Sequence, residues 1–135
     1  MAIKQITAFV ENQQGKLVEV TKLLADNGID LRALSIADTE DFGILRVIVN
    51  DTAKAYSVLA DNGVLVKTTD VIAVELSDRP GELSRALAVL NGAGINIEYL
   101  YAFISATPGK ADLVLRVADN AAAEKVLGEA GFKTE

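Results

Sequence analysis

Residues 78–100 read DRPGELSRALAVLNGAGINIEYL, and a stretch of the same shape lies 66 residues earlier. Residues 12–34 read NQQGKLVEVTKLLADNGIDLRAL. Identical residues stand at corresponding positions of the two stretches: Gly15 and Gly81, Leu17 and Leu83, Leu24 and Leu90, Gly28 and Gly94, Ile29 and Ile95, and Leu34 and Leu100. Self-similarity at a fixed period is the signature of a repeated structural unit. We therefore predict that the chain builds one unit twice.

The composition narrows the classes of function. The chain has 135 residues, half of them apolar, which allows one ordinary domain or two small ones with a real core. Its net charge of −6 disfavours nucleic acids and anionic membranes, because both are bound through basic residues. It contains no cysteine and no histidine, which excludes disulfides, thiol catalysis, the usual zinc sites and Ser-His-Asp chemistry. We expect neither a metal nor a cofactor.

The cellular location is predicted from what the sequence lacks. The first residues, MAIKQITAFVENQQ, do not contain the long apolar segment of a signal peptide. No apolar run approaches the 18 or so residues of a membrane span. We expect a cytoplasmic protein.

Hydrophobic periodicity gives the order of elements. Apolar residues at helical spacing alternate with short β-rich runs, and glycines follow the helical stretches. The first unit is predicted to contain strands at 3–10, 29–38, 44–49 and 64–68, with helices at 17–27 and around 55–62. The second is predicted to contain strands at 71–76, 95–104, 111–118 and 132–134, with helices at 83–90 and around 126–127. Turns are expected at 39–43 and 105–110.

These patterns predict an α+β fold. Two βαββαβ units imply two ferredoxin-like structures, each an antiparallel sheet with helices on one face. We place the units at residues 1–69 and 70–135, and expect their sheets to pack side by side so that the edge strands are covered. No Gly/Ser/Pro linker separates them, so we expect them to pack rigidly.

The stretch 78–97 resembles the signature of the ACT domain, a small amino-acid-sensing module. That signature is a strand, then D-x-P-G-x-L at a helix start, then G-I-N-I opening the next strand. Residues 78–83 and 94–97 match both parts. The first unit matches less fully, since Gln14 replaces the proline and Asp30 replaces the asparagine. The chain is similar throughout to stand-alone tandem ACT proteins, which have no fused catalytic domain.

The resemblance implies a binding site and a role. ACT modules bind small ligands, mostly amino acids, between the first βα turn of one module and the second strand of its neighbour. A residue at the Asn or Asp position of G-I-N-I contacts the ligand in several members. The implied ligand-binding residues are Arg79, Pro80, Gly81, Glu82, Leu83, Asn96, Ile97 and Tyr99 in the second unit, and Gln14, Gly15, Lys16, Leu17, Asp30 and Leu31 in the first.

The local chemistry suits a zwitterion at the second turn. The first N–H groups of a helix have no internal partner, and with the helix dipole they favour a carboxylate. The Asn96 side chain both donates and accepts, as an α-amino acid requires, whereas an ionised Asp30 only accepts. We therefore expect unequal sites in the two units. The alternative is that Pro80-Gly81 simply starts a helix and Asn96 ties a strand edge.

Other candidate residues have structural alternatives. The polar residues Gln13, Gln14 and Lys16 either contact a ligand or form a solvated turn. Tyr99, Tyr101 and Phe103 alternate along one strand and should share a face, while Leu100, Ala102 and Ile104 should meet the helices. The aromatic face either stacks on a ligand, meets a second subunit or is shielded by its own loops. Arg46 and Arg116 occupy matching strand positions, where a salt bridge or a solvated site is expected.

We expect a non-catalytic sensor that binds an amino acid at the interface between the units and regulates a partner enzyme or its own oligomeric state. A homodimer is expected, through edge pairing or the aromatic face. An acylphosphatase-like enzyme, which shares this small fold, is disfavoured because neither unit has its phosphate-cradling loop. A regulatory subunit that has lost its ligand sites and acts through protein contacts stays open.

Overall fold

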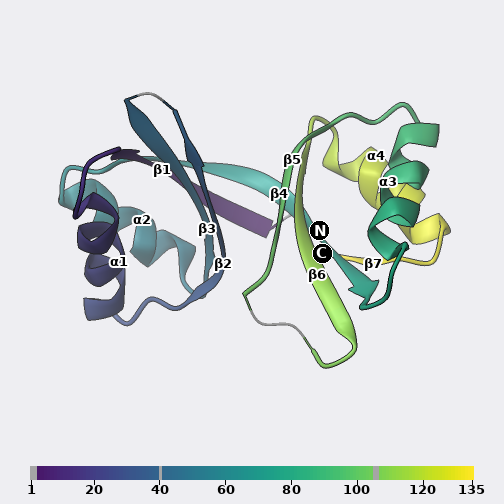
Figure 1. Cartoon of the computed structure of the whole chain (residues 1–135), viewed down its shortest axis with the longest axis horizontal. Helices are drawn as coiled ribbons and strands as arrows, with labels where there is room; N and C mark the ends of the chain where they lie inside the picture. Colours follow the sequence, from purple (N-terminus) through teal and green to yellow (C-terminus); the bar gives the residue numbers. More distant parts are fainter. Residues whose placement is uncertain (1–2, 40, 105–106) are drawn as a thin grey trace. The chain divides into compact units, whose positions relative to one another are not determined.

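The computed structural model describes residues 3–39, 41–104 and 107–135. Within them the chain divides into two compact units, Lys4–Thr69 and a second that includes Asp70–Glu135. The first contains β1 (Ile3–Glu11), α1 (Lys16–Asp26), β2 (Leu31–Asp38), β3 (Phe42–Val49), α2 (Thr52–Asp61) and the beginning of β4 (Leu65–Ser77) (Figure 1). The second contains the rest of β4, α3 (Glu82–Gly92), β5 (Ile97–Ala102), β6 (Lys110–Val117), α4 (Asn120–Glu129) and β7 (Lys133–Thr134).

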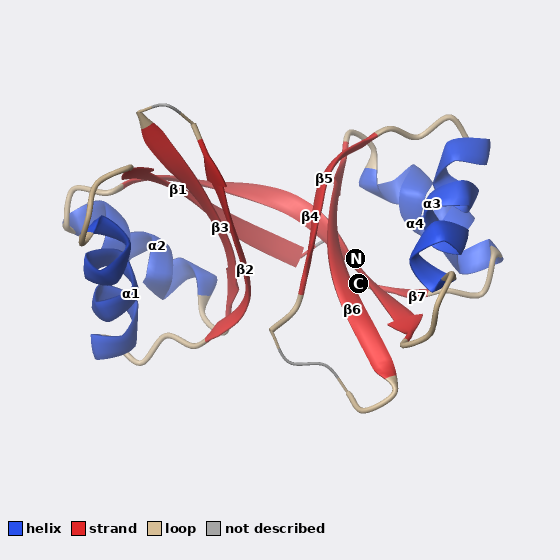
Figure 2. Cartoon of the chain, in the orientation of Figure 1, coloured by secondary structure: helices blue, strands red, loops and turns tan. Residues whose placement is uncertain are grey.

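Each unit has the predicted ferredoxin-like topology. The strand order is β2-β3-β1-β4 in the first unit and β5-β6-β4-β7 in the second. The registered strand pairs in both sheets are antiparallel. Figure 2 shows that the two helices of each unit cover one face of its own sheet. The predicted α+β fold of two βαββαβ units is therefore confirmed.

Each unit has its own hydrophobic core between helices and sheet. In the first, Leu24 of α1 and Leu59 of α2 pack with alternate residues of β1 and β3. In the second, Leu90 of α3 and Leu127 of α4 occupy the corresponding positions. These four leucines are at most 1% exposed. Burying each side chain stabilises the fold by roughly 1.5–3 kcal/mol, so the matched pair Leu24 and Leu90 of the sequence repeat marks equivalent core positions.

The helices end at the predicted glycines. The N–H of Gly28 donates to Ala25 and that of Ile29 to Leu24, which is the Schellman arrangement. Gly94 and Ile95 repeat both bonds at the end of α3. Because Ile29 and Ile95 complete a helix end, β2 and β5 begin two residues later than predicted.

Two local predictions were wrong, and part of the two expected turns is not described. The strands expected at 64–68 and 71–76 form the single strand β4, because Thr68-Thr69-Asp70 contains neither glycine nor proline to interrupt it. Phe42 and Gly43, expected in a turn, begin β3 and pair with Glu11 and Val10. Glu40, Ser105 and Ala106, in the two expected turns, lie outside the described residues.

The prediction for the two faces of β5 was also partly wrong. Leu100 packs on the helices as expected, but Ala102 and Ile104 are exposed, because β5 ends at Ala102. The register between β5 and β6 shifts between Ile97 and Tyr99, which marks a bulge at Glu98. The same shift occurs between Leu31 and Ala33 in β2. As a result of these bulges, Leu31 and Ile97 face the helices and pack against the cores of their units.

Candidate functional site

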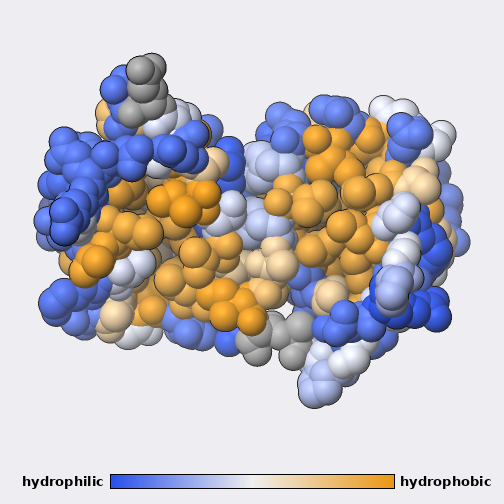
Figure 3. All heavy atoms as spheres, viewed as in Figure 1, coloured by the Kyte–Doolittle hydropathy of each residue, from blue (hydrophilic) through white to orange (hydrophobic). Residues whose placement is uncertain are grey.

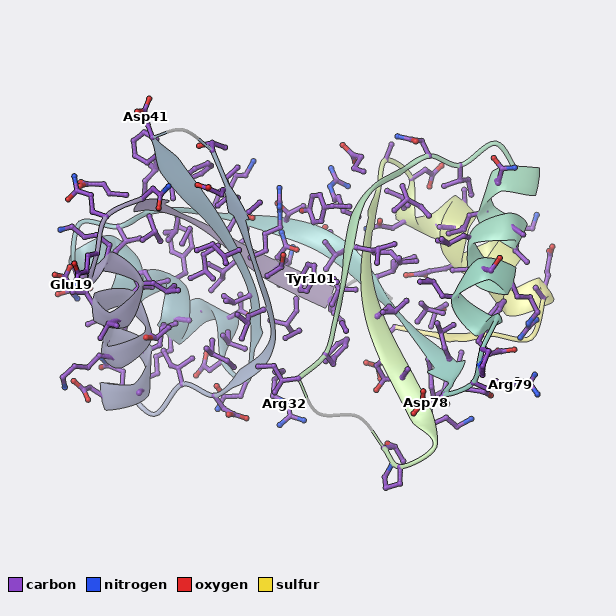
Figure 4. The ribbon with its side chains drawn as sticks, viewed as in Figure 1. Glu19, Arg32, Asp41, Asp78, Arg79 and Tyr101 are labelled. Carbon is purple, nitrogen blue, oxygen red and sulfur yellow. The ribbon has the colours of Figure 1, made fainter. Side chains whose placement is uncertain are left out.

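The turn between β4 and α3 is built around Gly81. This residue is the N-cap of α3 and has φ 92°, in the left-handed region that favours glycine. The N–H of Arg79 donates to the carbonyl of Ser77 over 2.9 Å, and that of Asp78 donates to Gly109 over 3.0 Å. Figure 4 shows Asp78 and Arg79 at the start of α3. The turn is thus fixed by backbone bonds on both sides.

The first unit repeats this turn without the proline. Gly15 caps α1 with φ 89°, and the N–H of Gln13 donates to Glu11 over 2.8 Å. The N–H of Asn12 donates to Asp41, as that of Asp78 does to Gly109. Gln14, which replaces Pro80, does not change this hydrogen bonding. The departure from the D-x-P-G pattern therefore leaves the backbone of the first turn intact.

The helices that follow these turns lack the side-chain cap that the other two helices have. Asp51 accepts a hydrogen bond from the N–H of Lys54 at the start of α2, and Asp119 accepts one from Ala122 at the start of α4. No side chain makes such a bond at the N-caps Gly15 and Gly81, both within the described residues. A carboxylate from outside the unit would satisfy the N–H groups left open there.

The surroundings of the two glycines are open and partly apolar. A Cβ atom placed on Gly15 or on Gly81 would meet no atom within 4 Å, so glycine is required by its φ and not by crowding. Leu17 and Leu83, two residues into each helix, are both 39% exposed. A ligand carboxylate at the helix start would therefore have an apolar surface beside it.

A buried carboxylate stands at the start of α3. Glu82 is 6% exposed, and its Oε1 accepts from Arg79 (Nη2, 3.0 Å) while its Oε2 accepts from Arg85 (Nη2, 3.3 Å). These two hydrogen bonds, that of Arg85 first, lower the pKa of Glu82 below its ordinary value. Both oxygens of this predicted ligand residue are therefore already held within the unit.

Arg85 extends the network to the C-terminal segment, a role that the sequence reading missed. Its Nη1 donates to the carbonyl of Ala130 over 3.3 Å, and its guanidinium lies 4.0 Å from the centre of the Phe132 ring. The spacing of three residues from Glu82 was the available signal. The contacts with Ala130 and Phe132 join residues 45 or more positions apart, which no local pattern indicates.

The first unit reverses the charges of this pair. Lys16 occupies the position of Glu82, Glu19 occupies that of Arg85, and their side chains form an ion pair of 3.6 Å. Both side chains are well exposed, unlike that of Glu82. Gln13 stands where the second unit has Arg79. The two turns therefore share a backbone and differ in charge.

The second group of predicted ligand residues lies at the other end of each helix. Asn96 is exposed just before β5. Asp30 is also exposed, its carboxylate pairs with Arg32 over 3.1 Å, and its N–H donates to the side chain of Asn50 over 2.9 Å. Tyr99 is half-buried and stacks on Tyr101, with ring centres 6.5 Å apart.

The fold does not bring the two groups together within one unit. The helix α3, of 11 residues, separates Gly81 from Asn96, and α1, of the same length, separates Gly15 from Asp30. Eleven helical residues span roughly 16 Å, which is more than an amino acid can bridge. A ligand that contacts both kinds of residue therefore needs the turn of one ACT-like unit and the strand of another.

The two strand arginines are half-buried, but the prediction that they occupy matching positions was wrong. Arg46 pairs with Thr7 and Ser35, whereas the equivalent residues of the second unit, Ala73 and Tyr101, pair with Val114. Arg116 of β6 forms the expected salt bridge, with its Nε 3.6 Å from Oε2 of Glu98. It also donates to the carbonyl of Val117. Arg46 of β3 lies across from Thr7 and Ser35 in the register. Arg116 thus holds Glu98, the bulged residue of β5, in place.

Two further features bear on the class of function. In the described part of the chain, no helix is long and apolar enough to cross a membrane. Nor do three carboxylates gather there in a group that could hold a metal ion.

Comparison with known proteins gives the family. Residues 1–132 match the family described as ACT domain pair. The crystal structure of protein BT0572 from Bacteroides thetaiotaomicron is 41% identical, with a TM-score of 0.93 over 100% of this chain and 92% of that one. The ligand-free regulatory subunit of aspartate kinase from Thermus thermophilus is 17% identical, with a TM-score of 0.69 over 95% of this chain and 92% of that one. The comparison with curated protein sequences found no match.

Proposed function

The chain belongs to the ACT domain pair family, and on that premise we propose that it is a non-catalytic regulatory protein that binds an amino acid. The ligand carboxylate accepts hydrogen bonds from the open N–H groups at the start of α3, beside Gly81. The exposed side chain of Leu83 contacts the apolar part of the ligand. Because α3 separates Gly81 from Asn96 within the second unit, Asn96 reads the α-amino group from the second unit of another copy of the chain.

The contrast between the four helix starts supports this proposal most strongly. Asp51 and Asp119 cap α2 and α4, whereas glycine leaves the starts of α1 and α3 without a side-chain cap. A side-chain cap stabilises a helix by about 1 kcal/mol. The cap is present at the starts of α2 and α4 and absent at the starts of α1 and α3. This pattern fits a carboxylate from outside the unit that binds at the starts of α1 and α3.

The second unit is the better amino-acid site. The exposed Asn96 side chain has donors and an acceptor. None of the side-chain contacts described above for the second unit involves it. The Asp30 carboxylate is paired with Arg32 in the first unit. We propose that the second turn binds the amino acid and that occupancy changes the contacts of the chain with a partner enzyme or with another copy of itself. The similarity to regulatory subunits of aspartate kinase is one of fold and leaves the partner open.

The test is a thermal-shift screen of the purified chain against each of the twenty amino acids. A ligand that binds only the folded state raises the Tm by mass action. We expect a shift for one class of side chain, abolished in Asn96→Ala and retained in Asn91→Ala, which alters an exposed asparagine of α3 outside the site. No shift with any amino acid would contradict the proposal and favour a regulatory subunit that acts through protein contacts alone.

A further inference from the structure

The residues just before β2 and β5 are equivalent in the two units, and each stands opposite the residue that follows the neighbouring strand. Asp30 lies opposite Asn50 and Asn96 lies opposite Ala118, because the first residue pairs of the two hairpins, one position further along, correspond to each other. Asn50 and Ala118 also each precede the aspartate that caps the next helix. The two positions can therefore be compared residue by residue.

In the first unit, Asn50 occupies the backbone of Asp30. Its Oδ1 accepts a hydrogen bond from the N–H of Asp30 over 2.9 Å, and its own N–H donates to the carbonyl of Asp30 over 3.2 Å. The Asp30 carboxylate accepts from Nη1 of Arg32 over 3.1 Å. Figure 4 shows Arg32 at the start of β2. The N–H, the carbonyl and the side chain of Asp30 each already have a partner.

In the second unit, Asn96 is open at the same position. The alanine at position 118 has no acceptor in its side chain. Among the described residues, neither the N–H nor the side chain of Asn96 makes a hydrogen bond. Glu98, which stands where the first unit has Arg32, pairs with Arg116 instead. Asn96 therefore presents a backbone donor beside a carboxamide that both donates and accepts.

We propose that Asn50 is an internal substitute for ligand in the first unit, and that the N–H of Asn96 is a further ligand donor in the second. This inference rests on the proposed function, in which Asn96 reads the α-amino group. Its N–H then donates to the carboxylate oxygen of the same amino acid. The Asn50 Oδ1 supplies an oxygen at the equivalent place in the first unit. Asn50 thereby decides which unit binds, and each chain takes up one amino acid.

The remainder of β2 does not replace the anchor that Asn50 occupies. Its exposed large side chains are apolar, since Leu34 is 39% exposed and Ile36 is 48% exposed. Figure 3 shows apolar side chains gathered along the strand. Asp38, at the far end, accepts a hydrogen bond from the amide of Asn12 over 2.7 Å. The charged groups of an amino acid are therefore best matched at the start of the strand, where Asn50 stands.

Closing the second unit in the same way tests the proposal. Ala118 is exposed, so a larger side chain should not disturb folding. In Ala118→Asn, the new side chain should accept from the N–H of Asn96 and slow hydrogen exchange of that amide. The probe is the amino acid that raises the Tm most in the screen of twenty. Calorimetric titration should show its binding weakened about tenfold, because the ligand must displace a hydrogen bond to make its own.

The matched control is Ala118→Leu, which adds a side chain of similar size without an acceptor. It should bind the probe as the unaltered chain does and leave exchange of the Asn96 amide fast. Equal weakening by Ala118→Leu would overturn the proposal. Unchanged binding by an Ala118→Asn variant whose Asn96 amide is protected would overturn it too, and would leave the proposed function standing.

Opening the first unit is the converse test. The unaltered chain should bind one amino acid per chain. The double variant Asp30→Asn/Asn50→Ala gives the first unit the residues that face each other in the second, and it should bind two. Two ligands per unaltered chain, or one per chain of the double variant, would overturn the role of Asn50 alone. Failure of every amino acid to bind the unaltered chain would overturn the proposed function and this inference together.

Discussion

The turn before α1 and the turn before α3 have one backbone and opposite charges. Both have a left-handed glycine, and in both one N–H donates to a neighbouring loop (Asn12 to Asp41, Asp78 to Gly109) and the next donates to the end of the preceding strand. Lys16 and Glu19 follow the first glycine, whereas Glu82 and Arg85 follow the second. The comparison teaches that glycine and the strand ends dictate the turn. The flanking side chains were free to diverge, and any difference in ligand preference between the units must therefore come from them.

The largest expected effect tests whether the two backbones are equivalent. Gly15→Ala and Gly81→Ala each force an L-residue into the left-handed region, at a cost of about 1–2 kcal/mol. The new methyl group meets no atom within 4 Å at either position, so backbone strain is the whole effect. Urea unfolding should give similar losses for both variants. Losses that differ by more than about 1 kcal/mol would show that the turns are not the same structure.

A smaller effect distinguishes the charges of the two turns. Glu82→Gln should lower the Tm at neutral pH more than Glu19→Gln does, because Glu82 is buried between two arginines and Glu19 is exposed. The lowered pKa of Glu82 means that its carboxylate adds stability above its ordinary pKa of about 4.5, and that this stability is lost as pH falls through the lower folded value. The difference between Glu82→Gln and the unaltered chain should therefore shrink in acid.

If the two glutamate variants lower the Tm equally at neutral pH, the charge network at the start of α3 is no stronger than the surface pair of α1. A difference that grows in acid would also contradict the assignment. Thermal unfolding followed by circular dichroism between pH 7 and pH 3 measures both quantities.

The smallest expected effect concerns an unfavourable charge that the first unit does not share. Asp112 of β6 faces Glu75 of β4 in the register, and burial first, then Glu75 and Glu135, raise its pKa. The corresponding pair of the first unit, Phe9 of β1 and Ile44 of β3, is apolar. Since the folded state disfavours the charged form, stability is greatest below the ordinary pKa of 3.8 and falls as pH rises through the folded value.

Asp112→Asn should therefore raise the Tm slightly at pH 7 and leave it unchanged near pH 3. Lys110 and Lys133 lie on the same sheet and partly offset the repulsion, so the gain is small. A lower Tm for the variant at pH 7 would mean that Asp112 makes a favourable contact in its charged form.

Local patterns predicted the features that depend on residues close in sequence. Gly28 and Gly94 ended their helices because the Schellman bonds involve only the last helical turn. The helical spacing of apolar residues placed the core leucines, Leu24 and Leu90, on the buried faces of their helices. The ferredoxin-like order followed from the duplicated pattern itself.

Features set by strand register could not be predicted. The bulges at Arg32 and Glu98 change which residues face the helices, and they depend on how each edge strand pairs with its neighbour. The contacts of Arg85 with Ala130 and Phe132 require α3 and the end of α4 to meet. The separation of Gly81 from Asn96 by the length of α3 likewise emerges from the fold. These are long-range relations, which a single sequence does not fix.

The most direct measurement of the central proposal follows the backbone amides of the ¹⁵N-labelled chain by NMR during titration with the amino acid that raises the Tm most. The proposal predicts that the largest shift changes occur at the N–H groups of Leu83 and Ser84, with smaller changes at Leu17 and Val18, because the N–H groups of Glu82 and Lys16 already donate to Arg79 and Gln13. Saturable binding that moves other amides and leaves the start of α3 unchanged would contradict it.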